Sequence, residues 1–256
     1  MWSVYFALFK TSVAHRLQYR ASLLIWLMSM IVHPLIFLVV WSTVAGAGSI
    51  RGYSASDFAT YYIVLMLVEY VVTSWVPWQF DEEIREGKLS PKLIKPVNPM
   101  HLFLFDSHGH KPFTFAVLLP VAALLAWHFD ANMAIGLPDV ALFAPALILA
   151  FGIRWLVDYT VALIAFWTTR MSAFRELYLI VFWFLSGWFA PHALLPSWLQ
   201  TITAISPFRW TLAFPIEVLL GRLDNPAILQ GLLIQCLWIG LAFAAYRVAW
   251  AAGVRR

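Results

Sequence analysis

Long apolar stretches alternate with short polar ones along most of the chain. Each stretch comes close to or exceeds the roughly 20 residues that a helix needs to cross the apolar layer of a membrane. We therefore predict an all-α polytopic membrane protein with six transmembrane helices, forming a single transmembrane domain over residues 1–256. The predicted spans cover residues 21–45, 58–79, 112–128, 140–169, 174–190 and 227–251.

The first twenty residues have a different pattern. Apolar side chains recur there at steps of three and four residues, which is typical of an amphipathic helix. The stripe consists of Trp2, Phe6, Phe9, Val13 and Leu17. Because Lys10, Arg16 and Arg20 are available to lipid phosphates, we predict a helix at residues 1–20 that lies in the membrane interface. An ordinary cytoplasmic lead-in is the alternative.

Composition supports the membrane assignment. Hydrophobic residues make up 62% of the chain and charged residues 12%, whereas soluble domains average about 45–50% and about 25%. Ala45 and Ala47 resemble a signal-peptidase site, but the preceding run is much longer than the about 7–15 residues of a signal peptide. It is therefore interpreted as a span. The single cysteine, Cys236, excludes a disulfide within the chain.

The distribution of cations fixes the predicted orientation. Loops on the cytoplasmic side of membrane proteins carry an excess of Lys and Arg. Three arginines, Arg51, Arg209 and Arg222, fall on one side, and Arg154 falls inside a span. Both termini and residues 80–111 are thus predicted to be cytoplasmic, and the net charge of +4 needs no nucleic-acid partner. The thirteen cations of the other side are Lys10, Arg16, Arg20, Arg85, Lys88, Lys92, Lys95, Lys111, Arg170, Arg175, Arg247, Arg255 and Arg256.

The loop after the second span is unusually charged. Residues 80–99 hold eight of the thirty charged residues of the chain. Unpaired charges are costly in lipid, so we expect this segment to lie in water, where a soluble partner could bind it. Acidic residues precede Gly87 and basic ones follow it. A short helix here would have its acids near the N-terminus, as the helix dipole favours, and Gly87 would end it.

Prolines interrupt the segment between the fifth and sixth spans. Residues 191–226 contain five prolines but stay apolar, and the run 211–220 is too short to span a bilayer. Irregular backbone at membrane depth is tolerated only against protein or water. We predict one or two re-entrant or interfacial helices on the outer side; a loose outer loop is the alternative.

Four ionisable residues fall inside the predicted spans: Glu69, Arg154, Asp158 and His33. Such residues are usually paired and face protein or water. An ion-pair network that fixes helix packing is one interpretation, with Glu69 and Arg154 near the same depth. A polar substrate path or proton coupling is the other. His33 precedes Pro34 and is interpreted as a hydrogen-bonded residue at a kink.

Signatures of a metal site or an enzyme are weak or missing. His101, Asp106, His108 and His110 have ligand chemistry, but their spacing matches no standard zinc site. No metal site and no catalytic residue is predicted. A phosphate-binding G-x-x-x-x-G-K-[ST] loop is missing, since Glu82 stands where its first glycine should be. The chain also has no H-E-x-x-H motif. No cofactor is therefore expected in this chain.

Taken together, the topology and the charged loop resemble the permease subunits of ABC-2 type exporters over nearly the whole length. The matching segments are 84–89 with 93–96, and Leu195-Pro196-Ser197-Trp198-Leu199 with Pro207-Phe208. Residues 214–217 and 220–223 are similar to the daunorubicin- or viologen-exporter-like subgroup. The DSHGH segment at 106–110 is not part of this resemblance.

The resemblance implies partners and a mechanism. Two permeases, identical or related, would bind two separate ATPase subunits that carry ATP and Mg²⁺. The chain would lie among membrane lipids in the plasma membrane, as in the bacterial inner membrane. The coupling helix that contacts the ATPase would include Glu82, Glu83, Ile84, Arg85, Glu86, Gly87, Lys88 and Leu89.

From these observations we expect a permease that exports a hydrophobic or amphipathic compound by alternating access at a dimer interface. A lipid or polysaccharide exporter is the alternative within transport. A non-transporting membrane scaffold or an intramembrane enzyme is the alternative from another class. Small residues at four-residue spacing, Ala245, Ala249 and Gly253, suit a close helix contact between two copies.

Overall fold

The computed structural model describes residues 6–7, 9–11, 13, 20–168 and 171–255. The long helices are α2 (Arg20–Ala45), α3 (Ala55–Val72), α7 (Lys111–His128), α8 (Leu137–Ala162), α9 (Met171–Leu185) and α12 (Asn225–Val254). The shorter helices are α4 (Val76–Arg85), α5 (Ser90–Leu93), α6 (Pro99–His108), α10 (Ser197–Ile205) and α11 (Ala213–Leu219). Three 3-10 turns, η1 (Leu163–Phe166), η2 (His192–Leu194) and η3 (Arg209–Thr211), join them. Strands β1 (Ser49–Ile50) and β2 (Tyr53–Ser54) form a small antiparallel hairpin.

Five segments of the described chain are long and apolar enough to cross a membrane. They cover Ile25–Ala45, Ala55–Arg85, Pro99–His128, Leu137–Phe166 and Asn225–Val254. The remaining predicted span, 174–190, overlaps α9, which has 15 residues. At 1.5 Å per residue that helix is only about 22 Å long. The all-α fold is confirmed, whereas the sixth span stays a prediction. The interfacial helix predicted at 1–20 falls largely outside the described residues.

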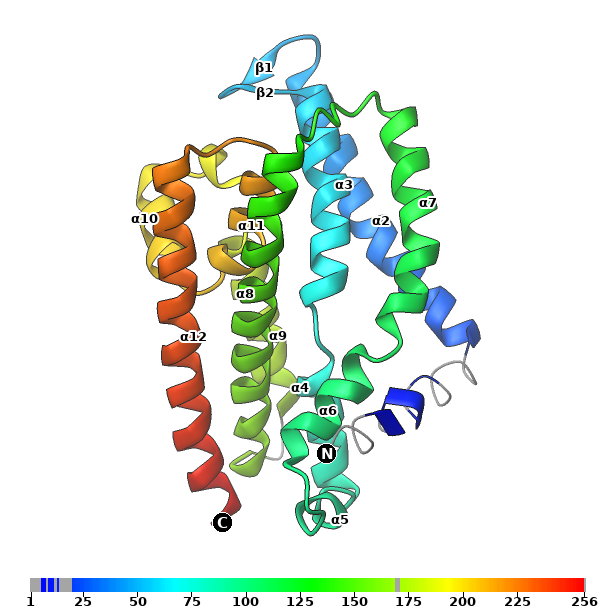
Figure 1. The fold of residues 1–256 in the computed structure, drawn as a ribbon, viewed down its shortest axis with the longest axis vertical. Helices are drawn as coiled ribbons and strands as arrows, with labels where there is room; N and C mark the ends of the chain where they lie inside the picture. The colour runs from blue at the N-terminus through cyan, green and yellow to red at the C-terminus, as the bar shows by residue number, and fades with distance from the viewer. Residues whose placement is uncertain (1–5, 8, 12, 14–19, 169–170, 256) are drawn as a thin grey trace.

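The segments that the distribution of cations assigns to opposite sides of the membrane lie at opposite ends of the molecule (Figure 1). Helices α4, α5 and α6 lie at the same end of the molecule as the last turn of α12 (Figure 1). The β1–β2 hairpin, the beginning of α3 and the helix α10 lie at the opposite end (Figure 1). The charged loop and the carboxyl-terminal end therefore share one side.

Helix α3 forms the centre of the bundle. It is apolar on all sides, as expected for a helix surrounded by protein, and twelve of its eighteen residues are buried. Helices α2, α7 and α8 pack against it, and α12 packs along α8. By contrast, α2 and α12 keep many large apolar side chains exposed, including Met28, Leu229 and Val248, as suits lipid-facing helices.

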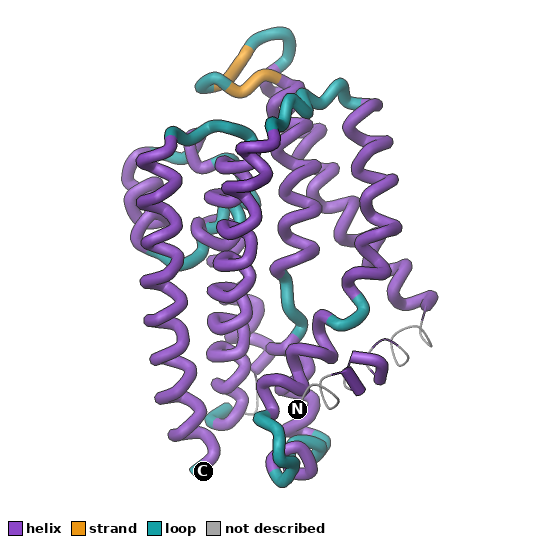
Figure 2. The backbone as a smooth tube through the Cα atoms, viewed as in Figure 1, coloured by secondary structure: helices purple, strands orange, loops and turns teal. Residues whose placement is uncertain are grey.

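Two of the candidate spans are broken, and the breaks are neighbours. The chain leaves the helix between α3 and α4 at residues 73–75, and between α6 and α7 at residues 109–110 (Figure 2). Lys111 joins the two, since its Nζ donates to the carbonyl oxygens of Val71 (3.1 Å) and Thr73. The predicted span 58–79 lies within the candidate span Ala55–Arg85, but the break inside it was not predicted. The side chain of Lys111 replaces donors that the interrupted helix no longer supplies.

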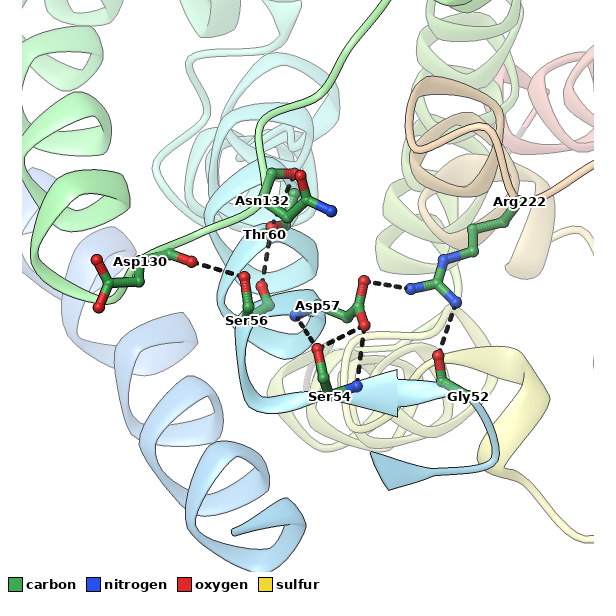
Figure 3. Close-up of polar contacts among 8 residues, drawn as sticks. All are labelled: Gly52, Ser54, Ser56, Asp57, Thr60, Asp130, Asn132 and Arg222. Carbon is green, nitrogen blue, oxygen red and sulfur yellow. Dashed lines mark hydrogen bonds and ion pairs between the residues drawn. The ribbon is translucent and has the colours of Figure 1, made fainter. Parts of the chain in front are cut away.

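The segment 191–226 is ordered and helical rather than a loose loop. It contains α10 and α11, and α11 is buried from Ala213 to Val218. The side chain of Arg222 ties this segment to the hairpin and to α3 (Figure 3). It lies 2.6 Å from the Asp57 carboxylate and donates to the Gly52 carbonyl at 3.0 Å. Asp57 also closes the capping box of α3 with Ser54.

Gly253 of α12, one of the small residues expected at a contact between two copies, instead packs within the chain. A side chain at Gly253 would collide with the ring of Phe166. Gly253 is therefore small because α12 packs against η1, and it gives no support to a dimer contact.

Candidate functional site

A cavity of about 220 Å³ lies among the helices beside the break in the second span. Its walls come from α2, α3, α4, α8 and α9, together with the turn after α9. Three of the four predicted intramembrane residues, His33, Glu69 and Arg154, line it. Five tryptophans also line it: Trp26, Trp75, Trp78, Trp183 and Trp188.

Arg154 is held by a buried network on one side of this cavity. Its Nε lies 2.8 Å from Oδ2 of Asp158, one turn along α8. Asp158 also accepts hydrogen bonds from Ser74 Oγ at 2.8 Å and from Tyr178 Oη at 2.5 Å. The guanidinium lies 3.6 Å from the centre of the Phe182 ring, a cation–π arrangement. One guanidinium nitrogen, Nη1, is buried without a hydrogen-bond partner.

Glu69 does not pair with Arg154, contrary to the sequence-based interpretation. The ion-pair partner of Arg154 is Asp158, and within the described residues Glu69 forms no ion pair within 4 Å. Its Oε2 instead accepts a hydrogen bond from the indole Nε1 of Trp188. Residues at positions i and i+4 of a helix face the same side, which favours Asp158 over a residue on another helix.

His33 behaves as predicted for a hydrogen-bonded residue beside a proline. Its Nδ1 lies 2.7 Å from the carbonyl oxygen of Ser29, one turn earlier on α2. Pro34 lies inside this helix and has no backbone N–H to donate. The centre of the His33 ring lies 6.3 Å from that of Trp188, and both residues line the cavity.

The histidine segment joins helices and does not gather metal ligands. Gln79 of α4 donates to Asp106 at 2.8 Å and accepts from Ser107 at 2.9 Å. The ring of His108 lies edge-on to Phe151, 4.9 Å between centres. Within the part of the chain that is described, no three His, Cys, Asp or Glu residues are grouped so that they could hold a metal ion.

The charged loop folds into two short helices. Helix α4 ends at Arg85, and Gly87 follows with φ of +68°, a left-handed conformation that glycine adopts without strain. Gly87 therefore ends the helix as predicted. The position of the acids was predicted wrongly, because α4 begins at Val76. Glu82 and Glu83 consequently lie near its carboxyl-terminal end, where the dipole does not favour them.

Packing explains where α4 begins. Pro77 occupies the first turn, where its missing N–H is tolerated. Val76 and Phe80 are buried and Ile84 is partly buried, so one side of α4 packs at four-residue spacing. Asp81 is buried too and lies 3.5 Å from Arg85. The segment is therefore amphipathic rather than fully solvated.

Internal ion pairs hold the charged loop together. Glu83 of α4 pairs with Lys92 of α5 across the Gly87 turn. Glu86 pairs with Lys88, and this hydrogen-bonded contact raises the pKa of Lys88. Beyond α5 the apolar side chain of Ile94 is 86% exposed, next to the 40% exposed Leu93. The tip of the loop thus presents apolar side chains surrounded by charges.

Sequence comparison identifies the family. The family model described as ABC-2 family transporter protein matches residues 22–256. The chain belongs to the ABC-2 transporter family. It is accordingly a multi-pass integral membrane protein and a permease component of an ABC transporter. No curated protein matches the chain in sequence comparison.

Membership defines the role of this ABC-2 chain within a larger transporter. ABC-2 permeases are membrane components that are not themselves catalytic, and membership implies partnership with an ABC ATPase. The match does not distinguish the daunorubicin- or viologen-exporter-like subgroup, which stays a prediction.

Several residues of the site were missed from the sequence of this ABC-2 chain. Lys111 was assigned to a cytoplasmic loop, and Ser74 and Tyr178 were not considered. A lysine directly after a Gly-His pair and before a proline marks an interrupted helix, which was the available signal for Lys111. Nothing local to Ser74 or Tyr178 indicates that each binds Asp158.

Proposed function

We propose that this chain is the permease subunit of an ATP-driven exporter of a hydrophobic or amphipathic compound in the plasma membrane. Two permeases, identical or related, would form the pathway and bind two ATPase subunits that carry ATP and Mg²⁺. Alternating access at the interface of the two permeases would move the compound. In a bacterium the membrane would be the inner membrane.

The shape of residues 80–99 is the observation that carries this proposal. The helix α4 and the turn after it form a rigid unit, because the Glu83–Lys92 pair and the packing of Phe80 hold it together. Its tip exposes Leu93 and Ile94 beside charged side chains. A compact surface with an apolar centre and a charged rim suits a protein interface. We infer that the coupling unit comprises residues 81–95.

The connection of this unit to the bundle provides a path for motion. Helix α4 follows α3 directly after the break at residues 73–75. Ser74 in that break binds Asp158 of α8, and α4 packs along α8. A displacement of α4 by a bound ATPase would therefore act on α3 and on α8, two walls of the cavity.

The chemistry of the cavity favours an amphipathic cargo over a polysaccharide. Its lining is mainly aromatic and apolar, which suits a ligand with a large apolar surface. Among the polar groups of this lining, Glu69 and Arg154 are the ones that would orient the charged part of such a ligand.

Binding of the ATPase tests the proposal. The chain would carry an affinity tag and be purified from the cells that naturally produce it. The ABC ATPase subunits that co-purify with it would be identified by mass spectrometry. Replacing Leu93→Asp together with Ile94→Asp should abolish co-purification and substrate-stimulated ATP hydrolysis. Membrane insertion should be unchanged, because both side chains are exposed. Ser49→Asp, an exposed change at the opposite end of the molecule, is the matched control.

Charge reversal gives a second test of the same surface. Glu82→Lys should weaken the ATPase contact, since Glu82 is exposed. Glu83 and Glu86 are left intact because their pairs with Lys92 and Lys88 hold the loop together. Unchanged ATPase binding by the apolar and the charge variants would refute the coupling role of the loop.

A further inference from the structure

We propose that the tryptophan-lined cavity binds the headgroup of a zwitterionic amphiphile, with its ammonium at Glu69 and its anionic oxygen at Arg154. The proposal deepens the proposed function by naming a class of ligand. It rests on that function only for the step from binding to export.

The cavity contains two polar groups whose binding capacity is not used within the chain. Glu69 accepts a hydrogen bond from Trp188 but forms no ion pair with any described cation within 4 Å. Arg154 is only 4% exposed, and its Nη1 has no hydrogen-bond partner. A buried donor without a partner is destabilising, so a ligand that supplies an acceptor there is stabilised by the new hydrogen bond.

Aromatic rings add a specific preference for an ammonium group. The rings of Trp183 and Trp188 are stacked, with centres 5.1 Å apart, and Trp188 also holds Glu69. Elsewhere in the lining, the centre of the Trp75 ring lies 4.7 Å from that of Trp26 and 5.1 Å from that of Trp78. Tryptophan is the best aromatic partner for a cation, and aromatic cages recognise substituted ammonium groups.

The charge balance of the lining excludes simpler ligands. Asp158 pairs with Arg154, whereas Glu69 has no ion-pair partner within 4 Å among the described residues. A purely anionic ligand would be repelled by Glu69, and a purely cationic one would leave Arg154 Nη1 unpaired. A zwitterion satisfies both, because an anionic oxygen forms a charge-assisted hydrogen bond with the guanidinium.

Size and access fit a headgroup whose tail extends outward. The volume of about 220 Å³ is below the roughly 300–1,000 Å³ of pockets that enclose whole drug-sized ligands. Two lining tryptophans are partly exposed at the molecular surface, Trp26 on α2 by 55% and Trp183 on α9 by 40%. The cavity is thus open at the molecular surface, where an acyl or aromatic tail can remain in the lipid.

Binding can be measured on the purified full chain without any ATPase. The chain in a maltoside detergent would be titrated with octylphosphocholine, octyltrimethylammonium and octyl phosphate, and intrinsic tryptophan fluorescence recorded. We expect octylphosphocholine to bind at least about tenfold more tightly than either singly charged probe, as two charge-assisted contacts predict. Equal affinity for all three probes would overturn the proposal.

Matched variants connect the signal to the two residues. Glu69→Gln should weaken octylphosphocholine binding about tenfold or more and bring its affinity to that of octyl phosphate. Because Arg154→Gln alone would leave Asp158 uncompensated, the double variant Arg154→Gln/Asp158→Asn is used to remove the anion contact. Glu176→Gln and Trp127→Phe, two exposed positions outside the cavity, should bind as the unmodified chain does. Unchanged binding by Glu69→Gln and by the double variant would refute the site.

Two sources of such a headgroup remain to be separated by experiment. Nanodiscs of phosphatidylethanolamine and of phosphatidylglycerol would each hold the chain during the same titration. If phosphatidylethanolamine weakens octylphosphocholine binding and phosphatidylglycerol does not, the occupant is a membrane lipid. If neither lipid competes with octylphosphocholine, the occupant is a free amphiphile. If octylphosphocholine binds as expected but does not change ATP hydrolysis by the partner ATPase, the exporter proposal is contradicted and the binding site is not.

Discussion

Arg154 and Asp158 form an ion pair within one turn of α8, with Nε and Oδ2 2.8 Å apart. Both side chains are nearly excluded from solvent, at 4% and 1% exposure. The pair joins three parts of the bundle, because Asp158 also binds Ser74 in the broken span and Tyr178 on α9. It therefore fixes the geometry of the cavity wall and of the break together.

Removing one partner of this pair should destabilise the protein strongly. Arg154→Gln leaves the Asp158 charge buried and uncompensated, which costs about 3–5 kcal/mol in comparable sites. Thermal unfolding in detergent should show a clearly lower midpoint. Arg154→Gln combined with Asp158→Asn should recover part of the loss, since no charge is then stranded. A double variant that is no more stable than the single one would contradict this account of the pair.

Lys111 should control the stability of the break in the second span. Its Nζ donates to the carbonyls of Val71 and Thr73, so Lys111→Met leaves these buried acceptors unsatisfied at about 1–3 kcal/mol. Hydrogen–deuterium exchange should then become faster over residues 70–78, which surround the break, and change less over the earlier part of α3. The control is Lys95→Met, which removes an exposed lysine. Equal exchange in both variants would show that Lys111 does not hold the break.

Acid should lower the stability of the folded protein through His192, which lies in the segment between α9 and α10. Burial and the nearby Arg209 lower the pKa of His192 to about 4, against 6.5 for an ordinary histidine. The unfolded chain therefore takes up a proton before the folded one, and stability falls as the pH drops from about 6.5 to about 4. The melting temperature should therefore fall more steeply with decreasing pH across this range for the unmodified chain than for His192→Gln.

A histidine elsewhere provides the comparison for this pH effect. His128→Gln changes an exposed histidine at the end of α7, and its melting temperatures should follow those of the unmodified chain. Identical pH profiles for His192→Gln and the unmodified chain would exclude His192 as the source.

The orientation can be tested with single cysteines in a Cys236→Ala background. Ser49→Cys lies exposed on the hairpin, while Ser90→Cys and Arg255→Cys are exposed at the other end. An impermeant thiol reagent added to intact cells should label position 49 only, as the positive-inside bias requires. Position 49 is preferable to Ser54, whose hydroxyl is engaged with Asp57. Labelling of position 90 from outside would reverse the topology.

Elements that depend on local sequence were predictable. The apolar runs gave the position of α2, α7, α8 and α12, because a segment in lipid must be apolar over its whole length. Gly87 was identified as a helix end, since its role depends on its own backbone. The Lys and Arg distribution placed the charged loop and the C-terminus at one end, and the ABC-2 resemblance was confirmed by the family match.

Relationships between distant residues were decided by the tertiary structure alone. The sequence put Glu69 and Arg154 at similar depth, with Asp158 one helical turn beyond Arg154, but the rotation of each helix about its axis determines which of them meet. That rotation depends on packing, such as the contact of Phe182 with the guanidinium of Arg154. Likewise, nothing near Lys111 in the sequence indicates the carbonyls of Val71 and Thr73, some forty residues earlier. Hydropathy determines which segments enter the membrane, whereas only side-chain packing between them brings charges and tryptophans around one cavity.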